Sequence, residues 1–334
     1  MAIIKISQNN LYYNLNQLAL KSGSKSKIAT VLKDNAYGHG IKIIAKLVSN
    51  WGVEQAVVIN NQEAGKIEEL FKNTLVLNDT PTQNPKRSYA ITEITALKNA
   101  PKDAKLELKV DTGMHRNGIL ISELQEALSI IKANGLNLYG VFTHYRSADE
   151  LSSEFSWQKA NFKQVKQLVK QTGIKGVRFH SHNSASLLRS NNFNEDLARI
   201  GIAMYGYNEL PNVFDPIELK PVLSLWAKCT SSRELKKGQK VGYGGSFSAP
   251  RDMVVSTYDI GYGDGLFRGD SHNPFIIKEG LPVLGRVSMD FISLESKKEE
   301  LCIFDNAQKA ANHFKTISYE ITTALKSEIE RIIV

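Results

Sequence analysis

The sequence predicts an α/β fold, in which an N-terminal (β/α)8 barrel of the TIM type is followed by a mainly β domain. Three observations predict this fold. Apolar, β-branched runs alternate with amphipathic stretches over roughly the first 210 residues. The alternation stops after Pro211, and 334 residues are more than one compact core usually holds. We expect the barrel domain to span residues 1–212 and the second domain residues 213–334.

Eight short runs in the first domain carry the strand signal. They are 27–32, 55–59, 74–77, a weak one near 89–91, 106–110, 138–143, 176–179 and 197–204. Helical periodicity marks 41–50, 62–72, 122–134 and 156–172. Such alternation predicts a parallel sheet, and eight units suggest that the sheet closes into a barrel. Because the fourth run is the weakest, a doubly wound open sheet is the competing architecture.

The second domain shows strands in succession, with turn signals and without convincing helices between them. We expect these strands at 222–229, 239–243, 253–260, 275–277 and 282–287. The pair Gly244 and Gly245 and the GYGDG stretch at 261–265 mark turns. A final helix or strand pair over 318–334 completes a mostly β domain.

Composition argues against several functional classes. The net charge is +8, but the lysines lie at helical spacing without interleaved aromatic residues, so we expect no nucleic-acid partner. No stretch approaches the ~20 apolar residues that span a bilayer, and the N-terminus lacks the long apolar region of a signal peptide. We therefore expect a cytoplasmic protein without a membrane partner. Cys229 and Cys302 lie far apart and near no histidine pair, so neither a disulfide nor a metal site is expected.

Chemically versatile side chains gather where predicted strands end. Lys33 follows the first strand, Arg116 lies in a turn-rich segment after the fifth, and His144 and His180 follow the sixth and seventh. In a barrel the carboxyl ends of the strands converge on one face, where active sites are built. A desolvated lysine at such a face is suited to Schiff-base chemistry. A single lysine there is more often a solvated loop residue, so the position alone leaves both interpretations open.

The segment VLKDNAYGHG at 31–40 resembles the cofactor-lysine motif of the alanine racemase family. Eight further segments resemble family signatures in the family's order and extend over almost the whole chain. They are KVDTGMHRNG (109–118), THYRSADE (143–150), HSHNSAS (180–186), RIGIAMYG (199–206), VGYGGSF (241–247), GYGDGLFR (261–268), GRVSMD (285–290) and ISYEI (317–321). One such motif would be weak, whereas nine collinear motifs are specific.

The resemblance implies that pyridoxal phosphate is the cofactor and that Lys33 carries it as an internal aldimine. The implied phosphate site comprises two tyrosines, a serine and the backbone of one turn: Tyr37, Tyr319, Ser184, Gly201 and Ile202. Hydroxyl and backbone N–H groups can hold a phosphate without a dedicated lysine. His144 is also implied to lie at the cofactor.

Arg199 is implied to contact the pyridine nitrogen of the cofactor. A guanidinium can only donate hydrogen bonds, so the ring nitrogen would stay unprotonated. The pyridine would then be a weaker electron sink than one that faces a carboxylate. This arrangement favours racemisation over transamination.

Racemisation needs a base on each face of the planar carbanion. The resemblance implies that Lys33 takes the proton from D-alanine and that Tyr243 takes it from L-alanine. Tyr243 would come from the partner subunit of a homodimer with shared active sites. A free tyrosine has a pKa of ~10 and is a poor base at neutral pH. His144 is implied to hydrogen-bond this tyrosine and to connect it to Arg199.

The remaining implied positions concern a small amino-acid substrate. Arg116 and the backbone at Met289 would bind its carboxylate. Lys109 matches a position that is often a carbamylated lysine, which would orient Arg116 as an anion. The residues implied at the substrate entryway are Tyr262, Arg268 and Asp290. The implied function is the interconversion of L-alanine and D-alanine, which supplies D-alanine for peptidoglycan.

Four positions depart from the family pattern. Asp34 stands beside the cofactor lysine where a small residue is usual, and Arg146 stands in THYRS where a small or apolar residue is usual and adds a charge near His144. Phe247 occupies a position that is commonly Tyr or Trp, and Ser288 stands where Cys is also common. These departures bear on substrate preference and rate rather than on reaction class.

Other functions stay open as alternatives. A racemase of broader specificity, for example for serine, would keep this chemistry in a roomier pocket. A single-domain barrel that binds pyridoxal phosphate would lack the domain of Tyr243. The related amino-acid decarboxylases pair a glutamate, rather than an arginine such as Arg199, with the pyridine nitrogen. A non-enzymatic barrel scaffold is the remaining alternative.

Overall fold

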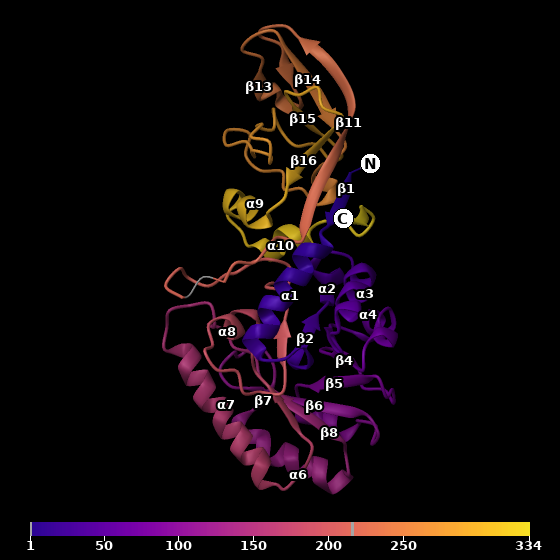
Figure 1. Cartoon of the computed structure of the whole chain (residues 1–334), viewed down its shortest axis with the longest axis vertical. Helices are drawn as coiled ribbons and strands as arrows, with labels where there is room; N and C mark the ends of the chain where they lie inside the picture. The colour runs from indigo at the N-terminus through magenta and orange to yellow at the C-terminus, as the bar shows by residue number, and fades with distance from the viewer. Residues whose placement is uncertain (1, 215–216) are drawn as a thin grey trace. The chain divides into compact units, whose positions relative to one another are not determined.

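The computed structural model describes residues 2–214 and 217–334 (Figure 1). The chain folds into two compact units. The barrel unit comprises Tyr12–Ala36 and Ile41–Leu219. The sheet unit comprises the N-terminal residues up to Leu11, the short segment Tyr37–Gly40 and Lys220–Val334. Each unit therefore draws on more than one stretch of the sequence.

Eight parallel strands form the barrel unit in the order β10-β2-β3-β4-β5-β6-β8-β9. They are β2 (Ile28–Val31), β3 (Gln55–Val58), β4 (Asn73–Val76), β5 (Arg87–Ile91), β6 (Lys105–Asp111), β8 (Leu138–Phe142), β9 (Arg178–His180) and β10 (Ala198–Ile200). Each strand overlaps one predicted run. A short strand, β7 (Ile119–Leu120), pairs with β6 outside this order. Valine, isoleucine and leucine fill these strands because both faces of a parallel sheet are buried.

The two ends of this row of strands are joined by backbone hydrogen bonds. The N–H of Asp196 donates to the carbonyl of Phe179 (3.1 Å), and the N–H of Arg199 donates to the carbonyl of His182 (2.9 Å). The sheet is thus a nearly closed barrel, so the barrel prediction is confirmed and the open-sheet alternative is wrong. The weakest predicted strand is β5, which pairs with β4 on one side and with β6 on the other.

Helices follow most strands of the barrel. They are α1 (Gln8–Ser22), α3 (Ile41–Trp51), α4 (Asn61–Gly65), α5 (Ile94–Lys98), α6 (Leu124–Asn134), α7 (Glu154–Gln171) and α8 (Ser184–Leu188), with short 3-10 turns η1 (Lys25–Lys27), η2 (Glu68–Leu70) and η3 (Ile121–Glu123). The predicted helices at 41–50, 122–134 and 156–172 correspond to α3, α6 and α7. The continuous helix predicted at 62–72 is wrong, because α4 ends at Gly65, a residue of low helix propensity.

The barrel core is clearest around β6. Leu106, Leu108 and Val110 of this strand are fully buried and pack in one cluster with Leu128 of α6 and Phe162 of α7. These three strand residues lie two apart in sequence and so share one face of the strand, and their burial stabilises the fold. In the described part of the chain, no helix is both long and apolar enough to cross a membrane.

The sheet unit is mostly β, as predicted. Its main sheet has the order β15-β14-β11-β1-β17, with β16 paired to β11. The elements are β1 (Ile3–Ile6), β11 (Leu223–Leu235), β12 (Lys240–Val241), η4 (Tyr243–Gly245), β13 (Phe247–Ser248), β14 (Met253–Tyr258), η5 (Tyr262–Asp264), β15 (Ile292–Leu294), β16 (Glu300–Phe304), α9 (Ala307–Phe314), α10 (Ser318–Thr323) and β17 (Glu330–Ile333). Figure 1 shows β11 as one long strand, which pairs with β1, β14 and β16.

Three details of the sheet unit differ from the prediction. Residues 3–6, which the predicted boundary assigned to the barrel, form β1 and lie antiparallel to β11. The strands predicted at 275–277 and 282–287 are wrong, since only an isolated bridge joins Ile276 and Pro282. Proline has no N–H to donate to a sheet, and Gly285 takes a positive φ of 76°. The boundary at 212/213 itself stays a prediction.

Candidate active site

The carboxyl ends of the barrel strands bring five of the predicted residues together. Lys33 follows β2, Lys109 lies near the end of β6, His144 follows β8 and Arg199 lies in β10. Arg116 lies in the loop after β6. The charges of all four cationic side chains lower the pKa of His144. Parallel strands end on the same rim, so this clustering follows directly from the barrel.

His144 is held as a neutral ring. Burial is the largest cause that lowers the pKa of His144, and together with the charges of Arg199, Arg116, Lys109 and Lys33 it brings this pKa to about 3. At neutral pH the imidazole therefore carries no charge and has one donor and one acceptor nitrogen. It can pass on hydrogen bonds without adding a further positive charge to the rim.

Arg199 is buried and fixed by backbone carbonyls. Its Nη1 donates to the carbonyl of His180 (2.8 Å), and its Nη2 donates to the carbonyl of Thr143 (2.6 Å). The guanidinium carbon lies 5.0 Å from the ring centre of Phe142. Burial lowers the pKa of Arg199 to about 10, so the side chain is still a cation at neutral pH. These contacts hold the guanidinium in place as a hydrogen-bond donor.

A buried network continues from Arg199 into the barrel. His180 accepts from Arg199 Nη1 at Nδ1 (2.7 Å), and its Nε2 lies 2.6 Å from Oε2 of Glu107. Burial opposes ionisation of Glu107, but Arg178 and His180 outweigh it and hold the pKa of this carboxyl well below its usual range. Burial also lowers the pKa of His180 to about 4. Glu107 was not predicted as a site residue, although a glutamate inside the apolar run of β6 was a signal for it.

Lys33 opens a left-handed turn, α2 (Lys33–Tyr37). Asp34, Asn35, Ala36 and Tyr37 all have φ between 53° and 55°, a conformation that costs roughly 1–2 kcal/mol per non-glycine residue. Two side-chain hydrogen bonds hold the turn: the Asn35 N–H donates to Oε1 of Glu63 (3.3 Å), and the Asn35 Oδ1 accepts from the N–H of Ile41 (2.9 Å). Local strain of this kind is typical of functional sites.

Hydrogen bonds join Ser184 to the turn after β10. The hydroxyl of Ser184, the first residue of α8, accepts from the N–H groups of Gly201 (3.1 Å) and Ala203 (3.3 Å). Ile202 lies between these two residues. A hydroxyl that accepts from two N–H groups still has its own hydrogen to donate to an anionic oxygen. The structure thus brings Ser184, Gly201 and Ile202 together, and their role toward a phosphate stays a prediction.

Lys109 lies beside the loop that carries Arg116. Its Nζ donates to Oδ1 of Asn117. Burial, followed by the charges of Arg116 and Arg199, lowers the pKa of Lys109 to about 8. Arg116 itself is exposed. Asp111 shapes the loop, because its Oδ1 accepts from the N–H of Gly113 (2.9 Å).

Two of the predicted phosphate residues, Tyr37 and Tyr319, contact each other in the sheet unit. Their ring centres lie 5.6 Å apart, with the planes tilted by 45°. The next residue, Gly38, has φ 78°, and a Cβ there would lie 1.9 Å from the carbonyl oxygen of Thr322. Only glycine allows this close approach of the Tyr37 segment to α10.

The predicted second base and entryway residues lie on exposed loops of the sheet unit. Tyr243, Tyr262 and Met289 expose 68%, 43% and 56% of their surface. The N–H of Tyr262 donates to the carbonyl of Ser288 (3.0 Å), and the N–H of Gly263 donates to the carbonyl of Met289 (2.8 Å). These bonds join the loops of Tyr262 and Met289. The other two entryway residues, Arg268 and Asp290, are exposed on the same loops.

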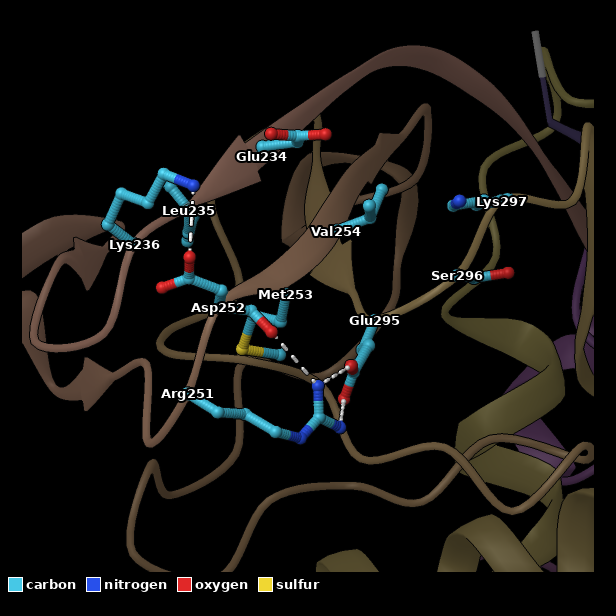
Figure 2. A pocket seen from close by; sticks show the side chains of 10 residues that line it. All are labelled: Glu234, Leu235, Lys236, Arg251, Asp252, Met253, Val254, Glu295, Ser296 and Lys297. Carbon is cyan, nitrogen blue, oxygen red and sulfur yellow. Dashed lines mark hydrogen bonds and ion pairs between the residues drawn. The ribbon is translucent and has the colours of Figure 1, made fainter.

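A separate open pocket is lined by residues of the sheet unit (Figure 2). It has a volume of about 430 Å³ and is lined by ten residues, from Glu234 to Lys297. Its charges largely pair with one another: Lys236 with Asp252 (2.9 Å) and Arg251 with Glu295 (2.7 Å). None of the ten described residues that line this pocket is a predicted site residue. This pocket therefore adds nothing to the site at the barrel rim.

Comparisons with known proteins agree with these features. Residues 6–209 match the family model "Alanine racemase, N-terminal domain", and residues 222–333 match "Alanine racemase, C-terminal domain". An alanine racemase of Nitratiruptor sp. is 48% identical over 99% of both chains, and one of Campylobacter jejuni subsp. doylei is 44% identical over the full length of both. The solved alanine racemase of Bacillus anthracis, with bound L-Ala-P, is 26% identical and superposes with a TM-score of 0.89, over 100% of this chain and 95% of that one. The chain belongs to the alanine racemase family.

Proposed function

We propose that the protein is a homodimeric alanine racemase that uses pyridoxal phosphate to interconvert L-alanine and D-alanine. One observation carries the proposal most strongly. The charges of four cationic side chains lower the pKa of His144 at one rim of the barrel, in a chain that belongs to this family. These side chains are Lys33, Lys109, Arg116 and Arg199. A cytoplasmic location and the supply of D-alanine for peptidoglycan are part of the same proposal.

The residues at the rim fit the cofactor. A concentration of cations requires anionic partners, and pyridoxal phosphate and an amino-acid carboxylate are both anions. The hydroxyl of Ser184, which accepts from the N–H groups of Gly201 and Ala203, has its own hydrogen to donate to a phosphate. When bound, the cofactor supplies an electron sink that acidifies the α-proton of an attached amino acid. Arg199 keeps that sink weak, because a guanidinium held by carbonyls can only donate to the ring nitrogen.

Two residues would move the α-proton. Lys33, once its amine is free, takes or returns the proton at Nζ on one face of the substrate's α-carbon. Tyr243 does so at Oη on the other face and comes from the partner subunit. A phenol needs a neighbouring polar group to act as a base at neutral pH. The neutral His144 is suited to that role, because it can exchange hydrogen bonds without becoming charged.

Arg116 and Lys109 would bind the substrate carboxylate. Arg116 offers a bidentate fork to a carboxylate. The pKa of Lys109, about 8, leaves part of its amine neutral near pH 7. A neutral amine can add to carbon dioxide, forming an N–C bond and releasing one proton, and the resulting carbamate would be an anion beside Arg116. The backbone at Met289 would complete the carboxylate site, with Tyr262, Arg268 and Asp290 at its entryway.

The dimer is supported by exposed side chains of the sheet unit. Tyr243, Tyr262, Met289 and Phe291 each expose more than two fifths of their surface, and exposed large apolar side chains can mark an interaction surface. A second copy of the chain would cover them and bring Tyr243 to the site.

The test is racemisation of L-alanine by the purified chain with added pyridoxal phosphate, followed by circular dichroism. We expect alanine to racemise, serine to racemise far more slowly, and Lys33→Ala to be inactive. Borohydride reduction followed by peptide mass spectrometry should place the cofactor adduct on Lys33. Absence of an adduct and of racemisation would overturn the proposal, while equal rates with alanine and serine would favour the broader-specificity alternative.

A further inference from the structure

Arg146 joins two loops of the barrel rim. The first loop, residues 111–118, carries Arg116, and the second, residues 143–148, begins beside His144. Nη1 of Arg146 donates to the carbonyl of Gly113 over 2.8 Å, and Nη2 pairs with the carboxylate of Glu154. The charges that act most strongly on His144 come from other residues. The contacts with Gly113 and Glu154 direct the guanidinium of Arg146 at the neighbouring loop and at α7.

The first turns of α7 connect the same two loops. Gln158 is fully buried, and its Oε1 accepts from the N–H of Arg146 (2.9 Å). Nδ2 of Asn161 donates to the carbonyl of Thr112 (3.0 Å). The hydroxyls of Thr112 and Thr143 lie 2.7 Å apart. Arg146 thus completes a set of hydrogen bonds in which α7 serves as the common support.

The backbone conformation of Gly113 brings its carbonyl within reach of Arg146. Its φ is 132°, and a Cβ at this position would lie 2.2 Å from the ring of Trp157 in α7. The guanidinium of Arg146 lies 5.9 Å from the centre of the same ring. The backbone of Gly113 consequently lies against α7, where its carbonyl is within reach of Arg146.

We propose that Arg146 is a positioning residue that fixes the 111–118 loop, and through it Arg116, relative to the rim of the barrel. The role of Arg116 toward a substrate carboxylate rests on the proposed function, whereas the loop clamp does not. Arg146 stands where a small or apolar residue is usual, so this clamp is a property of this chain rather than a requirement of the reaction. The clamp affects the affinity for the substrate rather than the chemical step.

The kinetic test compares Arg146→Met with the parent enzyme. A methionine cannot donate to Gly113, so we expect KM for alanine to rise roughly fivefold while kcat changes less than about twofold. Enantiomers have equal free energies in solution, so kcat/KM must fall by the same factor in both directions. Arg146→Lys keeps the charge but not the fork that reaches both Gly113 and Glu154, and it should give a smaller rise.

Hydrogen exchange measured by mass spectrometry gives a readout that needs no activity. In Arg146→Met, amides of 111–118 should exchange faster while the rest of the barrel is unchanged. Arg189→Met is the matched control, because Arg189 also donates to loop carbonyls, those of Ala148 (2.8 Å) and Glu150 (3.1 Å), but not to Gly113. It should loosen residues 148–150 and leave both the 111–118 amides and KM unchanged.

The outcomes separate the clamp from the proposed function. Faster exchange confined to 111–118, together with a raised KM, supports the inference. Unchanged exchange in that loop overturns it, and so does faster exchange throughout the barrel with kcat and KM altered together. If the chain does not racemise alanine at all, the proposed function fails while the exchange experiment still tests the clamp.

Discussion

Arg199 donates a hydrogen bond from Nη1 to Nδ1 of His180 over 2.7 Å, and this bond fixes which nitrogen of the ring carries the proton. Since Nδ1 accepts, the proton of the neutral ring lies on Nε2, which donates to Glu107. The position of Arg199 at the rim is thus connected, through one imidazole, to a carboxylate in the barrel interior. Glu107 in turn accepts from Nε of Arg178 (3.3 Å).

Removal of the Glu107 charge should therefore destabilise the protein strongly. In Glu107→Gln, Arg178 loses its buried counter-ion, and loss of one partner of a buried pair costs about 3–5 kcal/mol. The measurement is the midpoint of thermal unfolding followed by far-UV circular dichroism. Glu69→Gln is the control, because the carboxylate of Glu69 pairs with Lys86 but is 82% exposed, and we expect almost no shift. Equal shifts in the two variants would show that the network does not stabilise the barrel.

Stability should fall in acid through Glu195. Burial opposes its ionisation, but His182, Lys166 and Ser181 outweigh burial and lower the pKa of Glu195 from 4.5 to about 2. A carboxyl whose pKa is lowered on folding adds stability above its unfolded pKa and loses it as the pH falls through the folded value. The urea midpoint of the parent should therefore decrease between pH 4.5 and 2 more steeply than that of Glu195→Gln. Glu126→Gln, an exposed position of α6, should follow the parent. Parallel curves for Glu195→Gln and the parent would contradict this assignment.

The strand pattern predicted the barrel because most of its strands are buried on both faces. Such strands appear in the sequence as short apolar runs between helical stretches. Even β5, the strand with the weakest sequence signal, forms in the structure, and its Tyr89 and Ile91 are fully buried. The residues at the rim followed from the ends of these strands. Their roles came from the resemblance, because a lysine or arginine at a strand end has no unique chemistry.

Other features depend on distant partners and had no local signal. β1 pairs with β11 and β17, which lie more than 200 residues further along the chain. The left-handed turn after Lys33 is formed by ordinary residues and is held by Glu63, so its sequence does not show it. The helix predicted at 62–72 followed from the apolar periodicity of that stretch, whereas Gly65 within it is a local signal against a helix.

Lys109 should react with carbon dioxide at lower pH than other lysines. Burial and two neighbouring arginines lower its pKa to about 8, whereas an exposed lysine has a pKa of about 10.4. In 13C NMR with labelled bicarbonate, we expect a carbamate signal that grows as the pH rises through 8. The signal should be missing in Lys109→Arg and present in Lys132→Arg, a variant at an exposed position of α6. A signal that survives in Lys109→Arg would assign the carbamate to another amine.

Gly38 and Gly23 offer a matched pair of substitutions to alanine. Both glycines have nearly the same φ, 78° and 76°, so both variants pay the same left-handed penalty of about 1–2 kcal/mol. At Gly23 a new Cβ meets nothing within 4 Å, whereas at Gly38 it would lie 1.9 Å from the carbonyl oxygen of Thr322. We expect Gly38→Ala to cost a further ~1–3 kcal/mol through overpacking, and to separate Tyr37 from Tyr319.

Thermal unfolding measures the loss of stability. Titration with pyridoxal phosphate measures the separation of the two tyrosines, because the affinity for the cofactor should fall only in Gly38→Ala. If the two variants unfold at the same midpoint and bind the cofactor equally, the close approach of Tyr37 to α10 does not contribute to the phosphate site.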